Sequence, residues 1–316
     1  MKPFILLTLL VGFLFGADIK EPKASFISSG SVIDILYQDG RLYSATDAGC
    51  VDIFDFKSRA ILKKIEVPKI EDFMGDEIDS KVYSVDKINT KIMILSQGRD
   101  GFRRVHINQD GKTQLLIDYS KALTIAKAKF LNENTILLAL LSNELISYDI
   151  KKRTNNWLIQ VSGAKFSDFV LNESKDEVVI ADESGNLKIH STKDGKLLKT
   201  LAGENLDNVF QVDYKNGVIA TAGQDRRVVI YAPKTGSAYQ IKSDFLVYSV
   251  GLSPSGAIVG YASDENNNVT LLNSVTKSKI ARFGKNKMTL NRIVFINENE
   301  FLVASDDKTI NLYSVE

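Results

Sequence analysis

One short motif constrains the fold of this chain more than any other feature. It consists of an apolar residue, two variable residues and a second apolar residue, and it recurs seven times in 316 residues. Successive copies start 50, 43, 41, 43, 38 and 43 residues apart. The copies are VIDI (32–35), VYSV (82–85), IAKA (125–128), FSDF (166–169), VFQV (209–212), VYSV (247–250) and LNRI (290–293). Self-similarity at such a period indicates that each repeat is one supersecondary unit packed on its neighbours.

Each motif begins a series of four short apolar runs. In the fifth repeat the runs are VFQVDY, GVIATAG, RRVVIYA and AYQIKS, and apolar and polar residues alternate within them as in half-buried strands. Turn sequences such as QDG (38–40), KDG (193–195) and SPSG (253–256) separate the runs. Four short strands in about 40–45 residues are typical of a β-propeller blade. We therefore predict an all-β, seven-bladed propeller forming a single domain over residues 18–316.

The two ends of the repeat region indicate how the ring closes. The seventh repeat stops at TINLYSVE, after its third run, so its blade lacks a fourth strand. Before the first repeat there is one unassigned run, ASFISSG (24–30). We predict that this N-terminal strand completes the last blade, because such pairing leaves no long sheet edge exposed.

The third run of each repeat resembles the corresponding strand of WD40-type blades. Three repeats have an aspartate six positions before the last flat side chain of the run, in the pairs Asp100–His106, Asp225–Tyr231 and Asp307–Tyr313. The other repeats place Phe54, Tyr148, His190 and Leu272 at this position. The Gly-His and Trp-Asp signatures are missing, and the single tryptophan, Trp157, falls in a fourth run. The resemblance implies a WD40-like propeller in which flat side chains pack between neighbouring blades.

The two histidines allow two interpretations. In GRDGFRRVHI (98–107), His106 follows an aspartate and three arginines, as in some active sites. We favour a structural role, because both histidines occupy the position that other repeats fill with Tyr, Phe or Leu. No Ser/His/Asp triad then has a free base, and one cysteine with two histidines excludes Cys/His metal sites and a C-x-x-C-H haem site. We expect no catalytic, cofactor-binding or metal-binding residues.

Charge excludes another class of partner. The chain has 40 basic and 39 acidic residues and no long basic run, so it lacks the electrostatic footprint of a nucleic-acid-binding protein. The remaining enzymatic alternative is a propeller lyase or hydrolase that acts on sugars or lactones through the central channel.

The N-terminal segment has the pattern of a secretory signal peptide, which we assign to residues 1–17. Lys2 precedes an apolar run from Phe4 to Phe15, and small residues follow at Gly16 and Ala17. The alternative is an uncleaved anchor. No later segment is long and apolar enough for a membrane span, and the single Cys50 allows no internal disulfide. We expect an exported monomer in a bacterial periplasm.

The longest spacing between repeats contains an acidic insertion, EVPKIEDFMGDEIDSK (66–81), with six acidic residues against two lysines. An apolar pair lies in its middle, and an apolar pair flanked by acids fits a docking loop for a basic partner. The candidate partner-binding residues are Glu71, Asp72, Phe73, Met74, Asp76 and Glu77. The alternative is a solvated insertion without a role. The basic turns GRDGFRR (98–104) and QDRR (224–227) are expected on the other loop-bearing side or at the rim, as solvated charge.

Two longer stretches, LLTLLVGFLFGADIKEPKASF (6–26) and ASDDKTINLYSVE (304–316), resemble the L-type accessory proteins of periplasmic nitrate reductase systems in epsilonproteobacteria. The resemblance implies a non-enzymatic periplasmic protein that supports the reductase in maturation, assembly or electron delivery through protein–protein contacts. It does not imply that this chain holds molybdenum or haem. A general cell-envelope scaffold, such as an outer-membrane assembly factor, is the alternative.

Overall fold

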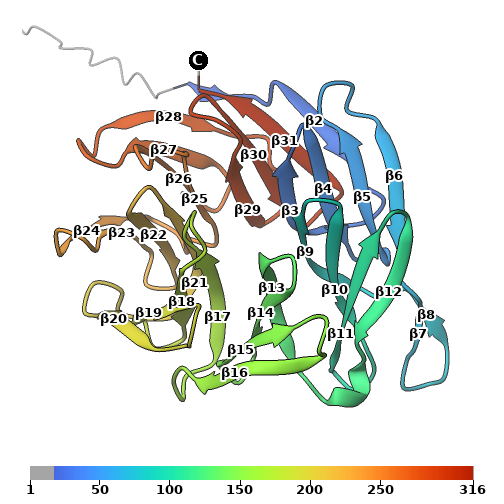
Figure 1. Cartoon of the computed structure of the whole chain (residues 1–316). Coiled ribbons are helices and arrows are strands. Elements are labelled where there is room, and N and C mark those ends of the chain that lie inside the picture. Colours follow the sequence, from blue (N-terminus) through green and yellow to red (C-terminus); the bar gives the residue numbers. More distant parts are fainter. Residues whose placement is uncertain (1–17, 316) are drawn as a thin grey trace, which may run out of the picture.

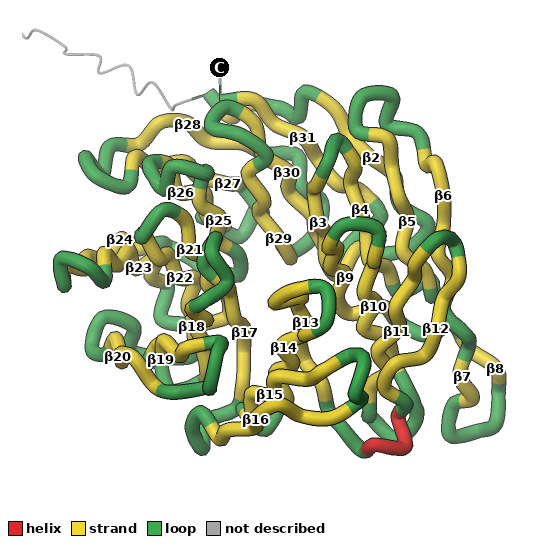
Figure 2. The backbone as a smooth tube through the Cα atoms, viewed as in Figure 1, coloured by secondary structure: helices red, strands yellow, loops and turns green. Residues whose placement is uncertain are grey.

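Each of the seven repeats folds into one antiparallel sheet, and the seven sheets surround a common axis (Figure 1). The computed structural model describes residues 18–315, so the predicted signal peptide at residues 1–17 lies outside the described residues. Within that range strands and turns dominate, with one 3-10 turn at Tyr119–Lys121 (Figure 2). No helix among these residues reaches the length and apolar character that crossing a membrane requires. The predicted all-β, seven-bladed propeller is confirmed.

The first four blades follow the repeats in chain order. Blade 1 contains β3 (Val32–Gln38), β4 (Arg41–Thr46), β5 (Cys50–Asp55) and β6 (Ile61–Glu66). Blade 2 contains β9 (Val82–Ile88), β10 (Lys91–Gln97), β11 (Arg103–Gln109) and β12 (Lys112–Ile117). Blade 3 contains β13 (Ile125–Asn132), β14 (Thr135–Leu140), β15 (Glu144–Asp149) and β16 (Thr154–Gln160). Blade 4 contains β17 (Phe166–Leu171), β18 (Glu177–Asp182), β19 (Leu187–Ser191) and β20 (Leu197–Leu201).

The last three blades complete the ring. Blade 5 contains β21 (Val209–Lys215), β22 (Val218–Gly223), β23 (Arg227–Ala232) and β24 (Ser237–Lys242). Blade 6 contains β25 (Val250–Leu252), β26 (Ile258–Ala262), β27 (Val269–Asn273) and β28 (Lys279–Phe283). Blade 7 contains β29 (Leu290–Phe295), β30 (Glu300–Ser305), β31 (Thr309–Ser314) and, from the other end of the chain, β2 (Ala24–Ile27).

The ring closes as the sequence predicts. β2 pairs antiparallel with β31, from Ala24 opposite Leu312 to Ile27 opposite Thr309, so the two ends of the chain build one sheet. A second contact was not expected: the two-residue strand β1 (Ile19–Lys20) pairs in parallel with β28 of blade 6. The N-terminal segment therefore ties two neighbouring blades together.

Strand direction defines two faces of the ring. We call the side on which the first strands begin the entry face, and the side on which they end the exit face. Neighbouring strands within each blade run antiparallel. The loops that lead into first strands and the turns between second and third strands therefore lie together on the entry face.

The core lies between adjacent blades, and the repeated motif supplies much of it. The first residue of every motif is buried, and these residues are Val32, Val82, Ile125, Phe166, Val209, Val247 and Leu290. Between blades 1 and 2, one cluster joins Tyr43, Ala45, Val51 and Ile53 to Val82, Val85, Ile92 and Ile94. Each large apolar side chain buried in this way contributes about 1.5–3 kcal/mol. Because this burial occurs between blades, a blade is stable only when it packs on its neighbours.

The third strands follow the predicted register in six blades. The expected bulky or flat residue lies opposite an apolar residue of the second strand, in the pairs Leu42–Phe54, Ile136–Tyr148, Val178–His190, Ile219–Tyr231, Val259–Leu272 and Phe301–Tyr313. In blade 5, Asp225 caps the turn before the third strand, because its Oδ1 accepts from the Arg227 amide at 3.1 Å and its Oδ2 from the Leu206 amide at 2.8 Å.

Blade 2 corrects the prediction for His106. The residue at the equivalent level is Asn108, opposite Ile92, and His106 lies two residues earlier, opposite Ile94. The turn between β10 and β11 is longer than the equivalent turn in blade 5, so the six-residue spacing from Asp100 to His106 is coincidental. Asp100 itself is exposed in that turn, with a φ of 56°.

Both histidines are nevertheless buried in the sheets. His106 is 2% exposed, and its Nε2 lies 3.0 Å from Ser96 Oγ. Burial, with a further contribution from the Arg104 charge, lowers the pKa of His106 to about 4. His190 Nδ1 lies 2.8 Å from the Gly195 carbonyl oxygen, so this nitrogen carries the proton and donates it. The two rings are in blades 2 and 4 and do not form one site.

Candidate functional site

Charged residues gather in two regions of the molecule, and only one of the two is predicted from the sequence. The region that is not predicted lies along the axis, where the first strands of the blades face one another. The third residue of the motif is polar in all seven copies: Asp34, Ser84, Lys127, Asp168, Gln211, Ser249 and Arg292. This regularity is visible in the sequence, but the motif as defined above uses only its first and fourth residues.

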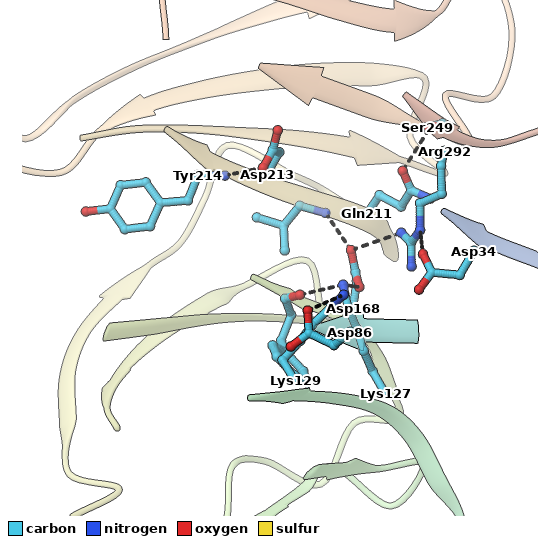
Figure 3. A network of polar contacts seen from close by, with 12 residues as sticks. Asp34, Asp86, Lys127, Lys129, Asp168, Gln211, Asp213, Tyr214, Ser249 and Arg292 are labelled. Carbon is cyan, nitrogen blue, oxygen red and sulfur yellow. Dashed lines mark hydrogen bonds and ion pairs between the residues drawn. The ribbon is translucent and has the colours of Figure 1, made fainter. Parts of the chain in front are cut away.

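We define the channel network as Asp34, Asp86, Lys127, Lys129, Asp168, Gln211, Asp213 and Arg292 (Figure 3). Lys127 Nζ lies 2.6 Å from Asp168 Oδ1, and Lys129 Nζ lies 3.5 Å from Asp86 Oδ1. Arg292 spans the axis, with its Nε 2.9 Å from Asp34 Oδ1 and its Nη1 3.7 Å from Asp168 Oδ2. Ion pairs thus join blade 7 to blades 1 and 4, and blade 3 to blades 2 and 4.

The same carboxylates also join consecutive blades through backbone amides. Each accepts a hydrogen bond from the first strand of the next blade: Asp34 from Val85 N at 3.3 Å, Asp86 from Phe130 N at 2.7 Å, Asp168 from Val212 N at 3.2 Å and Asp213 from Leu252 N at 2.8 Å. Such bonds satisfy backbone donors that have no partner within their own sheet. The network therefore holds the inner wall of the ring together.

Burial and pairing set the charges of this network. Burial by itself raises the pKa of Asp34, but the charges of Arg292, Lys129 and Lys127 more than offset this effect and lower the pKa below its ordinary value. Burial likewise acts to lower the pKa of Arg292, and the carboxylates of Asp34 and Asp168 raise it overall. Asp34 and Arg292 are therefore both charged at neutral pH. Buried charges held in pairs are typical of a structural network as well as of active sites.

A cavity opens on each side of the network. The cavity on the exit side has a volume of about 290 Å³ and is lined by residues such as Leu36, Lys129, Asp213 and Leu252. The cavity on the entry side, which we call the mouth cavity, has a volume of about 480 Å³. Asp168, Gln211 and Arg292 line both cavities, so the network divides the channel into two halves.

The predicted docking loop folds into a hairpin on the entry face. Its strands are β7 (Ile70–Glu71) and β8 (Glu77–Ile78), and we call residues 70–78 the acidic hairpin. Asp72 Oδ1 accepts hydrogen bonds from the amides of Met74 at 2.8 Å and Asp76 at 3.0 Å, and Gly75 completes the turn with a φ of 89°. The tip is therefore ordered, yet Phe73 is 95% exposed and Met74 is 72% exposed.

The base of the hairpin is attached to blade 2. Ile70 is buried, and Arg99 forms an ion pair with Glu71. The buried Arg104 side chain donates to the Pro68 carbonyl oxygen and, at 3.0 Å, to Ser80 Oγ. The expectation that the basic turn GRDGFRR lies on the other side of the ring, or as free charge at its rim, is therefore wrong. Antiparallel strands bring this turn to the entry face, beside the hairpin.

All six predicted partner-binding residues lie in the acidic hairpin. Glu71 is paired with Arg99, and Glu77 lies 3.8 Å from Lys69. The Asp72 carboxylate is engaged by the turn, and the apolar side chains of Phe73 and Met74 project from the tip. The geometry thus presents an apolar pair on an acidic, anchored support.

The comparisons with known proteins bear on the fold. No protein-family model matches the chain, and no curated protein matches it by sequence. Among solved structures, the chain is similar to the β-propeller domain of Cps50 (Swd1) from Myceliophteria thermophila, with a TM-score of 0.75 at 14% sequence identity. The match covers 93% of this chain and 99% of that chain. It confirms the WD40-like propeller fold, which many solved chains share and which does not select a function by itself.

Proposed function

We propose that this protein is a non-catalytic binding propeller that docks a basic protein partner through the acidic hairpin. The observation that carries the proposal is the exposure of Phe73, 95%, on an ordered turn. A large apolar side chain held ready in this way loses little conformational entropy on binding. Aromatic residues and methionine are also enriched in protein interfaces.

Charge indicates the chemistry of the partner. The acidic hairpin contains Glu71, Asp72, Asp76 and Glu77 and no basic residue. Acidic residues around an apolar centre favour partners with a basic rim, since complementary charge accelerates encounter and disfavours wrong partners. We therefore propose a partner surface with an apolar pocket bordered by Lys and Arg.

The absence of catalysis is part of the proposal. Both histidines are buried, and each ring has a hydrogen-bond partner within its own sheet. The channel network contains buried charges, but its cations and carboxylates are engaged with one another and with the backbone. These contacts support a structural role for the histidines and for the charged groups of the channel network, which are the side chains that catalysis would otherwise need.

We extend the proposal to a periplasmic accessory role with nitrate reductase. The signal-like pattern at residues 1–17 and the resemblance to the L-type accessory proteins support this choice. The partner would then be the periplasmic nitrate reductase or one of its electron-transfer or maturation proteins. In maturation or in electron delivery, the part that we propose for this chain is to dock its partner.

The test is direct binding to the purified reductase and its electron-transfer partners from the same organism, measured by biolayer interferometry. The double variant Phe73→Ser, Met74→Ser is expected to bind at least about tenfold more weakly, because it removes the exposed apolar pair. Val275→Ser is the matched control, since Val275 is 79% exposed in a turn on the exit face.

A second arm tests the biological role. Deletion of the gene is expected to lower periplasmic nitrate reduction, and the double variant is expected to restore it less well than the Val275→Ser variant. Unchanged reductase activity and maturation after deletion would contradict the nitrate reductase assignment. Equal binding of the reductase by the wild type, the double variant and the Val275→Ser variant would contradict the hairpin as the docking surface.

A further inference from the structure

The mouth cavity lies on the same face of the ring as the acidic hairpin. It is built from residues at or just before the start of first strands, among them Ile33, Phe210, Tyr248 and Asn291. Its volume of about 480 Å³ lies within the ordinary range of ligand pockets, roughly 300–1,000 Å³. The channel network forms its floor, so an occupant enters from the entry face and stops at Arg292 and Asp168.

One wall of the mouth cavity is aromatic. The rings of Phe210 and Tyr248 are stacked, with centroids 5.4 Å apart and planes inclined by 13°. Phe245 packs against Tyr248 from outside the lining, at 6.3 Å. All three side chains are only half-buried. Stacked rings offer an apolar surface to a side-chain stem, and their faces attract a cation.

The charge at the cavity is negative. Arg292 at the floor is balanced by the carboxylates of Asp34 and Asp168, and Asp168 is in turn paired with Lys127. These two cations and two carboxylates sum to zero. Asp306, at the rim, adds an exposed carboxylate. Its backbone amide donates to the Thr289 carbonyl oxygen at 2.9 Å, which holds Asp306 in place.

We infer that the mouth cavity receives one arginine side chain of the partner, stacked on the Phe210–Tyr248 wall and paired with Asp306. This inference rests on the proposed function, since it adds a second contact for the same basic partner. Arginine fits better than lysine, because its planar guanidinium stacks on aromatic rings while its N–H groups donate to a carboxylate. The acidic hairpin then captures the partner, and the mouth cavity fixes its position.

The experiment uses two short peptides as probes, acetyl-Gly-Gly-Arg-Gly-Gly-amide and the same peptide with citrulline, which keeps the shape of arginine without its charge. Binding to the full ¹⁵N-labelled protein is followed by NMR. The arginine peptide is expected to shift the resonances of Phe210, Tyr248, Gln211 and Asn291. It is expected to bind about tenfold more tightly than the citrulline peptide, the difference expected for one charge-assisted hydrogen bond.

Variants then locate the contact. Asp306→Asn is expected to weaken the arginine peptide about tenfold, and Tyr248→Leu about fivefold. Asp110→Asn, which removes an exposed carboxylate from a turn on the exit face, is expected to change nothing. Equal binding of the two peptides, or shifts confined to other parts of the ring, would overturn the inference.

The docking function and the arginine contact can be contradicted independently of each other. Partner binding that depends on Phe73 but not on Tyr248 or Asp306 would overturn the arginine contact and leave the docking function standing. Specific binding of the arginine peptide in the mouth cavity, without binding of the reductase or its partners, would retain the site and remove the nitrate reductase assignment.

Discussion

The channel network and the acidic hairpin are both rich in charge, but they use it in opposite ways. In the network, carboxylates and partly buried cations from different blades pair with one another, and the carboxylates also accept from backbone amides. In the hairpin, Glu71, Asp76 and Glu77 are exposed and Asp72 is partly buried, and they surround an apolar pair that nothing in the described chain covers. The difference separates two roles: the network holds the ring together, and the hairpin is free to meet another molecule.

The largest expected effect comes from breaking the network. Arg292→Met leaves Asp34 and Asp168 buried without their shared cation, so the free energy of unfolding should fall by about 3–5 kcal/mol. Urea denaturation followed by circular dichroism measures this change. Lys64→Met, which removes an exposed cation from the outer strand β6, should change stability by less than about 0.5 kcal/mol. Equal effects of the two variants would show that the network does not stabilise the ring.

How far the sequence predicts this arrangement depends on how far apart along the chain the interacting residues are. The blades follow from the apolar first and fourth positions of the motif, because these pack locally between consecutive repeats. Closure by β2 was also predictable, because one blade lacked a strand and one strand lacked a blade. Strand β1 is only two residues long, too short to show any alternation.

The ion pairs of the channel network could not be predicted from the sequence, for a different physical reason. Its polar positions were visible in each repeat, but the ion pairs join residues that are distant in sequence, such as Arg292 and Asp34, which are 258 residues apart. The register of His106 was missed because it depends on the length of one turn, between β10 and β11. The acidic hairpin was identified because an insertion interrupts a regular spacing, although its contact with Arg99 was not.

A pH titration of stability distinguishes the interior from the hairpin. Folding lowers the pKa of His106 from 6.5 to about 4, so between these values the unfolded chain takes up a proton that the folded chain does not. The contribution of His106 to stability should therefore be fully present above about pH 6.5 and be lost, by about 3 kcal/mol, as the pH is lowered to 4. Burial also lowers the pKa of His190, which adds to the loss in the same direction.

Chemical denaturation at several pH values measures this loss. His106→Gln should remove the part of about 3 kcal/mol that His106 contributes, while the part due to His190 remains. Asp76 is exposed in the hairpin, so Asp76→Asn is the control variant and should retain the loss that His106 causes. A His106→Gln protein with an unchanged pH dependence would show that the imidazole is not responsible. His106→Phe provides a second variant in which the ring shape is kept.

The smallest expected effect on stability comes from the hairpin itself. Phe73→Ser with Met74→Ser should change the free energy of unfolding by less than about 0.5 kcal/mol, because both side chains are already in water. Thermal and urea denaturation provide the check. A loss of several kcal/mol would mean that the apolar pair packs on the ring, and would remove the distinction between the two regions.

Everything proposed for this protein requires that the acidic hairpin is the surface that meets the partner. Amide hydrogen exchange of the protein, alone and with saturating periplasmic nitrate reductase, tests it most directly. Residues 70–78 should become protected in the complex, while the outer strands and the turns of the exit face should exchange as before. Protection restricted to the exit face, with unchanged exchange in the hairpin, would contradict the claim.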